Sequence, residues 1–313
     1  MKEIGGYIEL DKYQLPMLHD GAVALNCARN ALAYLIHSRK IKKIQIPKFL
    51  CDSVRNVCKK ENVEIKYYSI GLDFMPVDIQ LASDEWLYIV NFYGQISNDI
   101  LSDLANKYHR IIVDNVQAYF QAPLEHIDTI YTCRKFFGVP DGAFLYTNAR
   151  MKQDLSRDES FKRMQFLLGR FERSASEFYT DYVANNEFFE KEPVKQMSLL
   201  TDNLLHAIDY DYIKNKRTQN FTVLHEAFAK NNLLKLTVPE GAFMYPLYVN
   251  NGEEIRKKLH ALKIYIPTLW PDVFDVCDSS ELECDMAKNI LPLPVDQRYD
   301  EKDMQYLINT IKQ

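Results

Sequence analysis

The sequence lacks the cysteine and histidine pattern of a metal site. Its six cysteines include no C-x-x-C pair and have no clustered histidine partners. Zinc sites in proteins are built from such clustered ligands, so we expect no metal ion. Cysteines without a disulfide framework are typical of the reducing cytosol. The pattern therefore predicts free thiols and a cytoplasmic protein.

Long apolar runs are also absent. No stretch approaches the ~20 apolar residues that a membrane-spanning helix requires. The first residues, MKEIGGYIELDKYQ, are polar and carry acids, which argues against a signal peptide. The chain has no low-complexity segment, internal repeat or Gly/Ser linker. We expect no membrane partner.

The charge pattern does not favour nucleic-acid binding. The net charge is −5, and the lysines and arginines are dispersed along the chain. The densest basic cluster runs from Arg39 to Lys43. It is expected to end a helix, where cations interact favourably with the helix dipole. We therefore expect no nucleic-acid partner.

Length and hydrophobic pattern predict a two-domain α/β protein. The 313 residues, 47% of them hydrophobic, can bury a full core, and we expect a large domain over 1–235 and a small C-terminal α/β domain over 236–313. Strands and helices alternate in the first half, as in a parallel sheet with ligands at its carboxyl edge. Helices are predicted at 21–38, 52–61, 100–108, 252–261 and 300–311, and strands at 41–47, 64–69, 85–92, 111–114, 144–146, 234–240, 242–249 and 263–270.

The segment 151–235 is predicted to be mostly helical. It is long and charged, and one stripe of it is apolar. Core and interface packing explains such a stripe better than a cofactor contact does. Its members are Phe161, Met164, Leu167, Leu168 and Phe171.

The most informative residues are Asp114 and Lys135. Asp114 ends the short β-branched run that begins at Ile111, and Lys135 stands 21 residues further on among apolar residues such as Phe136 and Phe144. Apolar surroundings lower the pKa of a lysine and favour its nucleophilic, neutral amine. An amine nucleophile and a strand-end carboxylate are what pyridoxal 5'-phosphate (PLP) chemistry needs. The simpler alternative is a turn-capping aspartate and a lysine whose stem lies on apolar surface.

Two motifs resemble the DegT/StrS family of PLP-dependent sugar aminotransferases. Asp114 and Gln117 match its D-x-x-Q at the end of a strand. Its K-x5-[ED]-G-[GA] motif is matched without a gap by Lys135 and by 141–143, which read D-G-A. The chain end from Leu291-Pro292 to Asp303-Met304 is similar to the family's C-terminal domain. The resemblance covers nearly the whole chain in order.

The resemblance implies a fold-type-I PLP enzyme that works as a homodimer. Lys135 would form the Schiff base with the cofactor and then act as general base, and Asp114 would pair with the pyridinium nitrogen, staying ionised beside that cation. Gln117 would donate to the phenolic oxygen of the ring. The implied reaction moves an amino group from glutamate or glutamine to a nucleotide-linked keto-sugar, for cell-surface polysaccharide or lipopolysaccharide.

The phosphate is expected at the amino terminus of the first helix. The stretch LNCARNAL stands where the family has its phosphate-binding turn, which assigns that role to Cys27, Ala28 and Arg29, mainly through backbone amides. For Arg29 a solvent-facing side chain is the equal alternative. Thr132 is placed to reach the phosphate with its hydroxyl. A cysteine at position 27 replaces the family's small polar residue or glycine, which removes one hydroxyl contact.

The residue that stacks on the cofactor ring is left open by the sequence. The family's aromatic position falls near Cys51, with Phe49 two residues away, so either side chain is a candidate. Tyr93 and Gln95 follow another central strand and are expected to line the pocket, Tyr93 reaching the substrate.

One departure from the family concerns the segment that reaches into the partner's phosphate site. The family has an N-Y-R-M-S-like sequence there, and this chain has Val194-Lys195-Gln196-Met197-Ser198. Met-Ser is retained, but the asparagine and the arginine are not. The residues that could take the place of the missing asparagine and arginine at the phosphate are Lys195, Asn185 and Asn186.

Two other functions remain open. A PLP enzyme acting on an amino acid or small amine would need an arginine to hold the α-carboxylate, and Arg298 is the candidate. A non-catalytic scaffold with the same fold is the other alternative. Retention of Asp114, Gln117 and Lys135 together argues against a scaffold.

Overall fold

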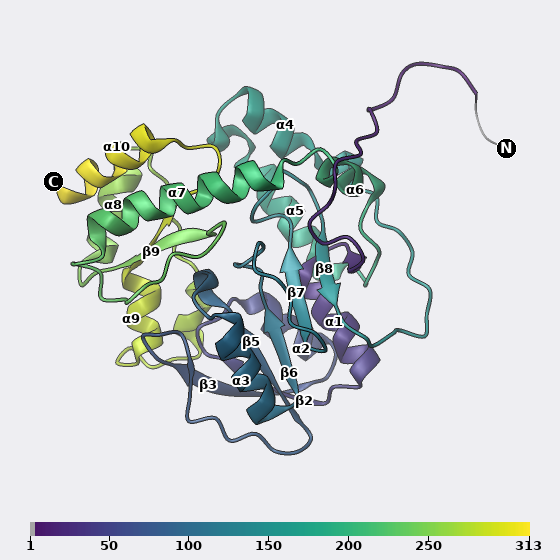
Figure 1. The fold of residues 1–313 in the computed structure, drawn as a ribbon, viewed down its shortest axis with the longest axis horizontal. Coiled ribbons are helices and arrows are strands. Elements are labelled where there is room, and N and C mark those ends of the chain that lie inside the picture. The colour runs from purple at the N-terminus through teal and green to yellow at the C-terminus, as the bar shows by residue number, and fades with distance from the viewer. Residues whose placement is uncertain (1–3) are drawn as a thin grey trace.

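A mostly parallel sheet forms the centre of the computed structural model, which describes residues 4–313 and leaves residues 1–3 of the predicted large domain outside the described part (Figure 1). Its strand order is β1-β8-β7-β6-β5-β2-β3-β4. The strands are β1 (Val23–Leu25), β2 (Lys43–Pro47), β3 (Glu64–Ile70), β4 (Pro76–Val77), β5 (Glu85–Val90), β6 (Ile111–Asp114), β7 (Asp128–Thr132) and β8 (Ala143–Tyr146). The five neighbouring strands β7, β6, β5, β2 and β3 run parallel to one another. At the two sides of the sheet, β8 pairs antiparallel with β7 and β1, and β4 pairs antiparallel with β3. The predicted α/β architecture is confirmed.

Three helices connect the strands of the first half. They are α1 (Ala28–Arg39), α2 (Asp52–Lys60) and α3 (Asn98–Tyr108). α1 packs against α2, β7 and β8, and α3 packs against β6. A side-chain oxygen of Ser97 caps the start of α3 by accepting from the Ile100 amide at 3.4 Å. These crossovers bring the carboxyl ends of β5, β6 and β7 to one edge of the sheet.

The first predicted helix begins too early in the sequence. Residues 21–27 are not helical: Val23–Leu25 form β1, which pairs with β8, and Cys27 is extended with φ −161°. Ala24 and Leu25 fit a helical spacing, but three apolar residues in a row, Val23–Leu25, fit a short buried strand equally well. Pairing with β8, more than a hundred residues away, decides between the two.

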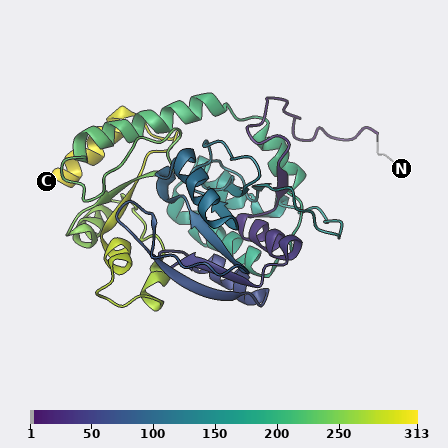
Figure 2. The same cartoon turned by 60° about the horizontal axis from the view of Figure 1, so that its bottom comes forward.

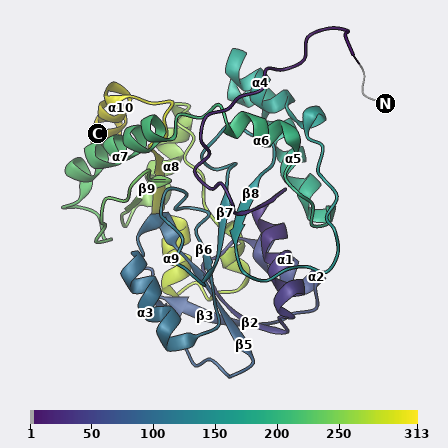
Figure 3. The same cartoon turned by 45° about the vertical axis from the view of Figure 1, so that its right-hand side comes forward.

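The segment after β8 is mostly helical, as predicted. Its helices α4 (Gln165–Glu172), α5 (Tyr179–Lys191) and α6 (Leu199–Leu205) gather beside one end of the sheet (Figure 3). Two short 3-10 turns, η2 (Phe161–Arg163) and η3 (Ala175–Phe178), precede α4 and α5. The long helix α7 (Tyr210–Phe228), green in Figure 2, then runs across the molecule to the C-terminal elements.

The C-terminal part consists of β9 (Met244–Tyr248), α8 (Gly252–Ala261), α9 (Leu282–Asn289), β10 (Ile290–Pro294) and α10 (Glu301–Lys312). A second hydrophobic cluster holds most of it together, whereas α9 packs with the main core through Cys284, Met286 and Ala287. Phe221 and Leu224 of α7 pack with Leu247 of β9 and Leu307 of α10 in the second cluster. Since α7 precedes residue 236, the domain boundary stays a prediction. Among the described residues, no helix is both long and apolar enough to span a membrane.

The predicted helices over 252–261 and 300–311 are confirmed, but two predicted strands in this part are wrong. The stretches 234–240 and 263–270 contain no strand, and β9 pairs with β10 instead. In the second stretch Lys263 has φ 59°, and Pro267 has no N–H to give to a ladder. The alternation of apolar residues in KIYIPTLW is therefore not the mark of a strand.

Buried His19 gives the fold a pH dependence. Its ring lies 4.3 Å from the Tyr131 ring, and burial lowers its pKa from 6.5 to about 4. The unfolded chain takes up a proton below pH 6.5, whereas the folded chain does not until about pH 4. We therefore expect the free energy of unfolding to fall by up to about 3 kcal/mol as the pH drops through this window.

Urea unfolding of the wild type and of His19→Gln at pH 7 and pH 4.5 measures this contribution. The variant should lose much of the difference between the two pH values, while His37→Gln, which changes an exposed histidine, should keep it. Equal pH slopes in the wild type and His19→Gln would contradict this, because they would mean that burial does not lower the pKa of His19.

Candidate active site

Lys135 and Asp114 lie at the same edge of the sheet. Asp114 is the last residue of β6, and Lys135 stands in the turn that follows the neighbouring strand β7. The side chain of Asp114 is buried. The ammonium nitrogen of Lys135 lies 5.4 Å from the centre of the Phe243 ring, which belongs to the C-terminal part. The two motif residues thus follow neighbouring strands, with the Phe243 ring beside the amine of Lys135.

The environment of Lys135 favours its neutral amine. Lys135 is exposed to water on one side, yet enough protein surrounds its nitrogen that desolvation lowers its pKa. Asp114 raises that pKa in part, and the like charge of Arg134 lowers it further. An accessible amine with a lowered pKa has the two properties that a nucleophilic lysine requires.

Asp114 is held by two hydrogen bonds. The Tyr88 hydroxyl donates to Oδ2 at 2.7 Å, and the Val116 amide donates to Oδ1 at 3.0 Å. Its pKa is nevertheless raised, because burial outweighs both Lys135 and these donors. The expectation that Asp114 stays ionised depends on the pyridinium cation of the bound cofactor, so it stays a prediction. Each carboxylate oxygen keeps a lone pair for a further donor.

The side chain of Gln117 is oriented by the backbone of the turn that follows the neighbouring strand β5. Its Oε1 accepts from the Tyr93 amide at 2.7 Å, which identifies the oxygen because an N–H needs an acceptor. Its Nε2 makes no hydrogen bond among residues 4–313. This leaves the amide nitrogen as the end that can donate, as its predicted role requires.

The predicted phosphate residues lie at the start of α1. Cys27 is its N-cap and is buried, Ala28 and Arg29 form its first turn, and burial raises the pKa of the Cys27 thiol to about 11. No side chain caps this helix, and its first turn carries no acid. Thr132 ends β7 and is buried, with no side-chain hydrogen bond among the described residues. Their contact with a phosphate stays a prediction.

The structure separates the two candidates for ring stacking. Phe49 is 1% exposed, with its ring 4.5 Å from the Trp270 ring and 5.4 Å from the Phe92 ring, so it has no free face. Cys51 is half-buried and close enough to Lys135 to affect its pKa. The core packing of the Phe49 ring does not favour a stacking role for it, and the proximity of Cys51 to Lys135 favours Cys51. The stacking residue stays a prediction.

Tyr93 and Gln95 have partners away from Lys135. The Tyr93 ring is buried beside Phe74 and Trp270. Gln95 binds the backbone of Thr237 in both directions, at 2.8 and 3.1 Å. These contacts tie the turn after β5 to the C-terminal segment and do not favour the predicted substrate contacts.

Asp141 and Ser198, from two separate motifs, meet in the core. Asp141 is fully buried and accepts from the amide and the hydroxyl of Ser198, both at 2.8 Å, and from the Thr201 hydroxyl. The next residue, Gly142, has φ +110°, and a Cβ there would lie 3.1 Å from Cys133 Sγ. Only glycine suits this position, so the D-G pair holds the far end of the Lys135 turn.

Val194–Ser198 and Arg298 are engaged within the chain. Gln196 pairs with Leu25 of β1 as an isolated bridge, and the Lys195 ammonium binds Glu192. Arg298 forms a two-point contact with Asp296, at 2.6 and 2.8 Å. Its guanidinium is therefore occupied, which speaks against the amino-acid alternative.

Sequence reasoning missed two residues that frame Lys135. Arg134, whose only signal was its place next to the lysine, has a guanidinium near Cys27 and Arg29. Arg217 of α7 is fully buried and donates to the backbone oxygens of Phe136 (3.2 Å) and Ala242 (3.0 Å). Nothing local marks Arg217, since its partners lie far along the chain.

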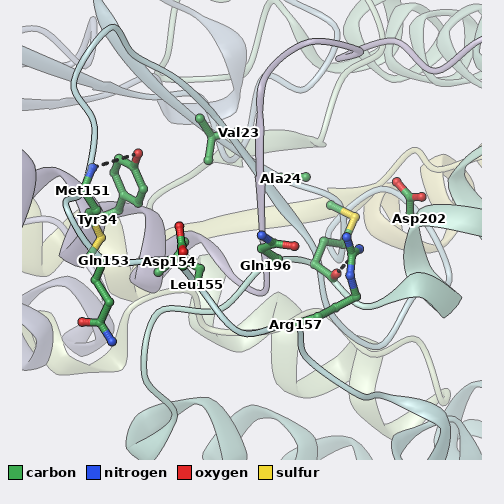
Figure 4. A pocket seen from close by; sticks show the side chains of 11 residues that line it. Val23, Ala24, Tyr34, Met151, Gln153, Asp154, Leu155, Arg157, Gln196 and Asp202 are labelled. Atoms are coloured by element: carbon green, nitrogen blue, oxygen red, sulfur yellow. Dashed lines mark hydrogen bonds between the residues drawn. The ribbon is translucent and has the colours of Figure 1, made fainter.

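One cavity and one cluster of possible metal-binding side chains lie outside the Lys135 site. A cavity of about 370 Å³ beside β1 is lined by Val23, Tyr34, Arg157 and Asp202 among others (Figure 4), and neither Lys135 nor Asp114 lines it. The side chains of Cys277, Glu281 and Glu283 lie close together. Lys48 binds Glu281, and the Ile70 amide donates to Glu283, so protein partners already serve these acids.

Comparison with solved structures identifies the fold. DesV of S. venezuelae, in complex with a ketimine intermediate, matches 93% of this chain and 84% of its own at 15% identity, with a TM-score of 0.66. A putative sugar aminotransferase of Streptococcus pneumoniae in its PMP form matches 93% and 86% at 14% identity and 0.65. A DegT DnrJ EryC1 StrS aminotransferase of Brucella abortus matches 93% and 85% at 14% identity and 0.63.

The chain has the fold of the DegT/StrS-type aminotransferases. The predicted type I PLP fold is thereby confirmed. No family model matches the sequence, and no curated protein matches it. At the carboxyl edge of this sheet, Asp114 ends β6, Lys135 follows the neighbouring strand β7, and Gln117 accepts from the Tyr93 amide after β5.

Proposed function

We propose that this chain is a PLP-dependent aminotransferase. The observation that carries the proposal is the meeting of Lys135, Asp114 and Gln117 beside the uncapped start of α1. Lys135 offers an accessible amine with a lowered pKa, and Asp114 a buried carboxylate with lone pairs to spare. Gln117 offers an amide nitrogen with no other partner among the described residues.

These residues fit the chemical groups of PLP. The aldehyde requires an amine (Lys135), the ring nitrogen a carboxylate (Asp114), and the phenolic oxygen a donor (Gln117). The phosphate requires amides and positive charge, which the start of α1 and the buried, partnerless Nε of Arg134 supply. When bound, PLP supplies an electron sink that stabilises negative charge on a substrate carbon.

The protein's own part in the reaction follows from this arrangement. Nζ of Lys135, neutral once released, accepts a proton from one atom of the substrate and returns it to another. Asp114 holds a proton on the ring nitrogen through charge, and Tyr88 and Val116 keep its carboxylate in place. Arg217 and Gln297 fix the Lys135 turn by donating to Phe136 O, at 3.2 and 2.8 Å.

The substrate we propose is a keto-sugar carried on a nucleotide, with glutamate or glutamine as amino donor. The solved structures that share the fold include proteins described as sugar aminotransferases. Together with the motif resemblance, this supports a role in amino-sugar synthesis for cell-surface polysaccharide. Free cysteines in the described residues support a cytoplasmic location, which cell fractionation tests.

The decisive experiment is a PLP titration followed by absorbance, borohydride reduction and peptide mapping. We expect a new absorption band and a reduced adduct on Lys135. Glutamate should then discharge the band by giving its amino group to the cofactor, and a nucleotide keto-sugar should restore the band by accepting that group. Small amines should not discharge it. A protein that shows no band at saturating PLP would instead be a scaffold with an enzyme's fold.

We further propose that the functional unit is a homodimer. The stripe expected to pack in the core or an interface faces solvent in the single chain: Phe161 is 63%, Leu168 60% and Phe171 94% exposed. Tyr179 of α5 adds to the patch at 64%. Single chains rarely leave large apolar side chains grouped in water, so a second copy is the occupant we propose.

Light scattering of the wild type and of Phe171→Glu tests the dimer. We expect the wild type to be dimeric and the variant to shift to monomer, because a buried charge at the interface is costly. Tyr306→Glu on α10, also exposed, is the control and should stay dimeric. A monomeric wild type at micromolar concentration would contradict the proposal.

A further inference from the structure

Arg134 carries a cation that the protein itself leaves without a counter-ion. Its Nη2 donates to Asn186 Oδ1, and its guanidinium carbon lies 5.0 Å from the centre of the Phe189 ring. Its Nε is buried with no hydrogen-bond partner, and Arg134 takes part in no ion pair within residues 4–313. A buried guanidinium is normally matched by a carboxylate or an anionic ligand.

The neighbours of Arg134 increase this imbalance. Burial lowers its pKa, and the charges that act on it include two more arginines, Arg29 and Arg163. Asp158 binds Arg163 at 2.7 Å, whereas Arg29 has no ion pair in the described chain. Besides burial, the groups with the largest effects on the pKa of Arg134 are Tyr182, Cys27, Arg29 and Arg163, and none of them is a carboxylate. Arg134 and Arg29 are thus the two arginines here without an ion pair among the described residues.

The same place holds the uncapped start of α1. Both Arg29 and Arg134 are close enough to the N-cap, Cys27, to affect its thiol. This helix has 12 residues, no capping side chain and no acid in its first turn. Its free amides and the positive end of its dipole therefore point to an anion. The helix end and the guanidinium without a counter-ion are independent features, and both require an anion.

We infer that Arg134 binds the phosphate of the cofactor from within the same chain, together with the first-turn amides of α1. This inference rests on the proposed function and extends it. Lys195, the other basic candidate, is already bound to Glu192. Arg134 is adjacent to Lys135, so one turn carries both the amine for the aldehyde and the guanidinium for the phosphate. Asn186 and Phe189 of α5 hold the guanidinium in position.

The test compares two ligands that differ only in the phosphate. Dissociation constants for PLP and for pyridoxal are measured by absorbance with the wild type and with Arg134→Met. We expect the variant to bind PLP about tenfold to a hundredfold more weakly, because it loses a charge-assisted contact. Its dissociation constant for pyridoxal should be unchanged. Inorganic phosphate should compete with PLP in the wild type and much less in the variant.

Two variants make the result specific. Arg173→Met removes an exposed, Glu177-paired arginine and should leave both constants unchanged. Arg134→Lys keeps the charge and should recover part of the PLP affinity. Unaltered PLP affinity in a folded Arg134→Met protein, or an equal loss for PLP and pyridoxal, would overturn the inference. A wild type that binds neither ligand would instead refute the proposed function.

Discussion

Replacing Lys135 by methionine should reduce the aminotransferase rate by about 10⁴-fold or more, because it removes both the nucleophile and the proton carrier. Methionine keeps much of the side-chain length, so the contact with Phe243 and the fold should persist. PLP should still bind, through Asp114, Gln117 and the start of α1, but borohydride should no longer fix it to the protein.

Single-turnover kinetics and mass spectrometry after reduction measure these effects. Lys162→Met, which changes a lysine on the surface turn η2, serves as the control and should retain activity and adduct. Near-normal turnover by the Lys135 variant would mean that another amine does the chemistry. Since burial lowers the pKa of Lys135 and so favours its nucleophilic form, that outcome would also remove the basis of the active-site assignment.

Replacing Asp114 by asparagine should separate catalysis from stability. We expect the rate to fall by about 10²–10³-fold, the cost of losing one preorganised electrostatic group. The folded protein should be as stable as the wild type or more so at pH 7. Burial raises the pKa of Asp114, so its ionised form costs folding free energy that a neutral amide does not.

Urea unfolding and steady-state kinetics on the same preparation test both halves. The isosteric amide can still accept from Val116 and meet the Tyr88 hydroxyl. Asp128→Asn is a contrasting control. Asp128 pairs with Arg39 at 2.8 Å at the opposite end of β7 from Lys135, so its replacement should lower stability and leave the rate unchanged. A large loss of stability in Asp114→Asn would show that the carboxylate serves the fold and not the cofactor.

The parts of the site that could be predicted are those written in short, contiguous motifs. Asp114 and Gln117 follow one strand, and Lys135 and Asp141 bracket one turn, so their spacing alone indicates a common site. The partner of Asp141 could not be found in this way. Ser198 stands 57 residues further on, and only the packing of α6 against the turn brings its hydroxyl to the carboxylate.

Errors arose where one pattern fits two structures. The apolar residues of Val23–Leu25 fit a helix until β8 is available as a partner. The apolar residues of KIYIPTLW fit a strand by their alternation, yet the structure has no strand there and instead packs Trp270 against Phe49, more than two hundred residues away. In both cases a distant segment decides, because burial against it is worth more than any local preference.

The sequence by itself determined the alternation of strands and helices from β2 to β6, the PLP-type motifs and the expectation of a type I fold, because these depend on periodicity and short spacing. Only the tertiary structure decided how the site is charged and supported. It made burial outweigh the attraction of Lys135 in setting the pKa of Asp114. It also placed Arg217 against the backbone of the Lys135 turn and left Arg134 without a counter-ion beside α1. Such effects depend on how segments distant in sequence exclude water from one another, and no local pattern records that.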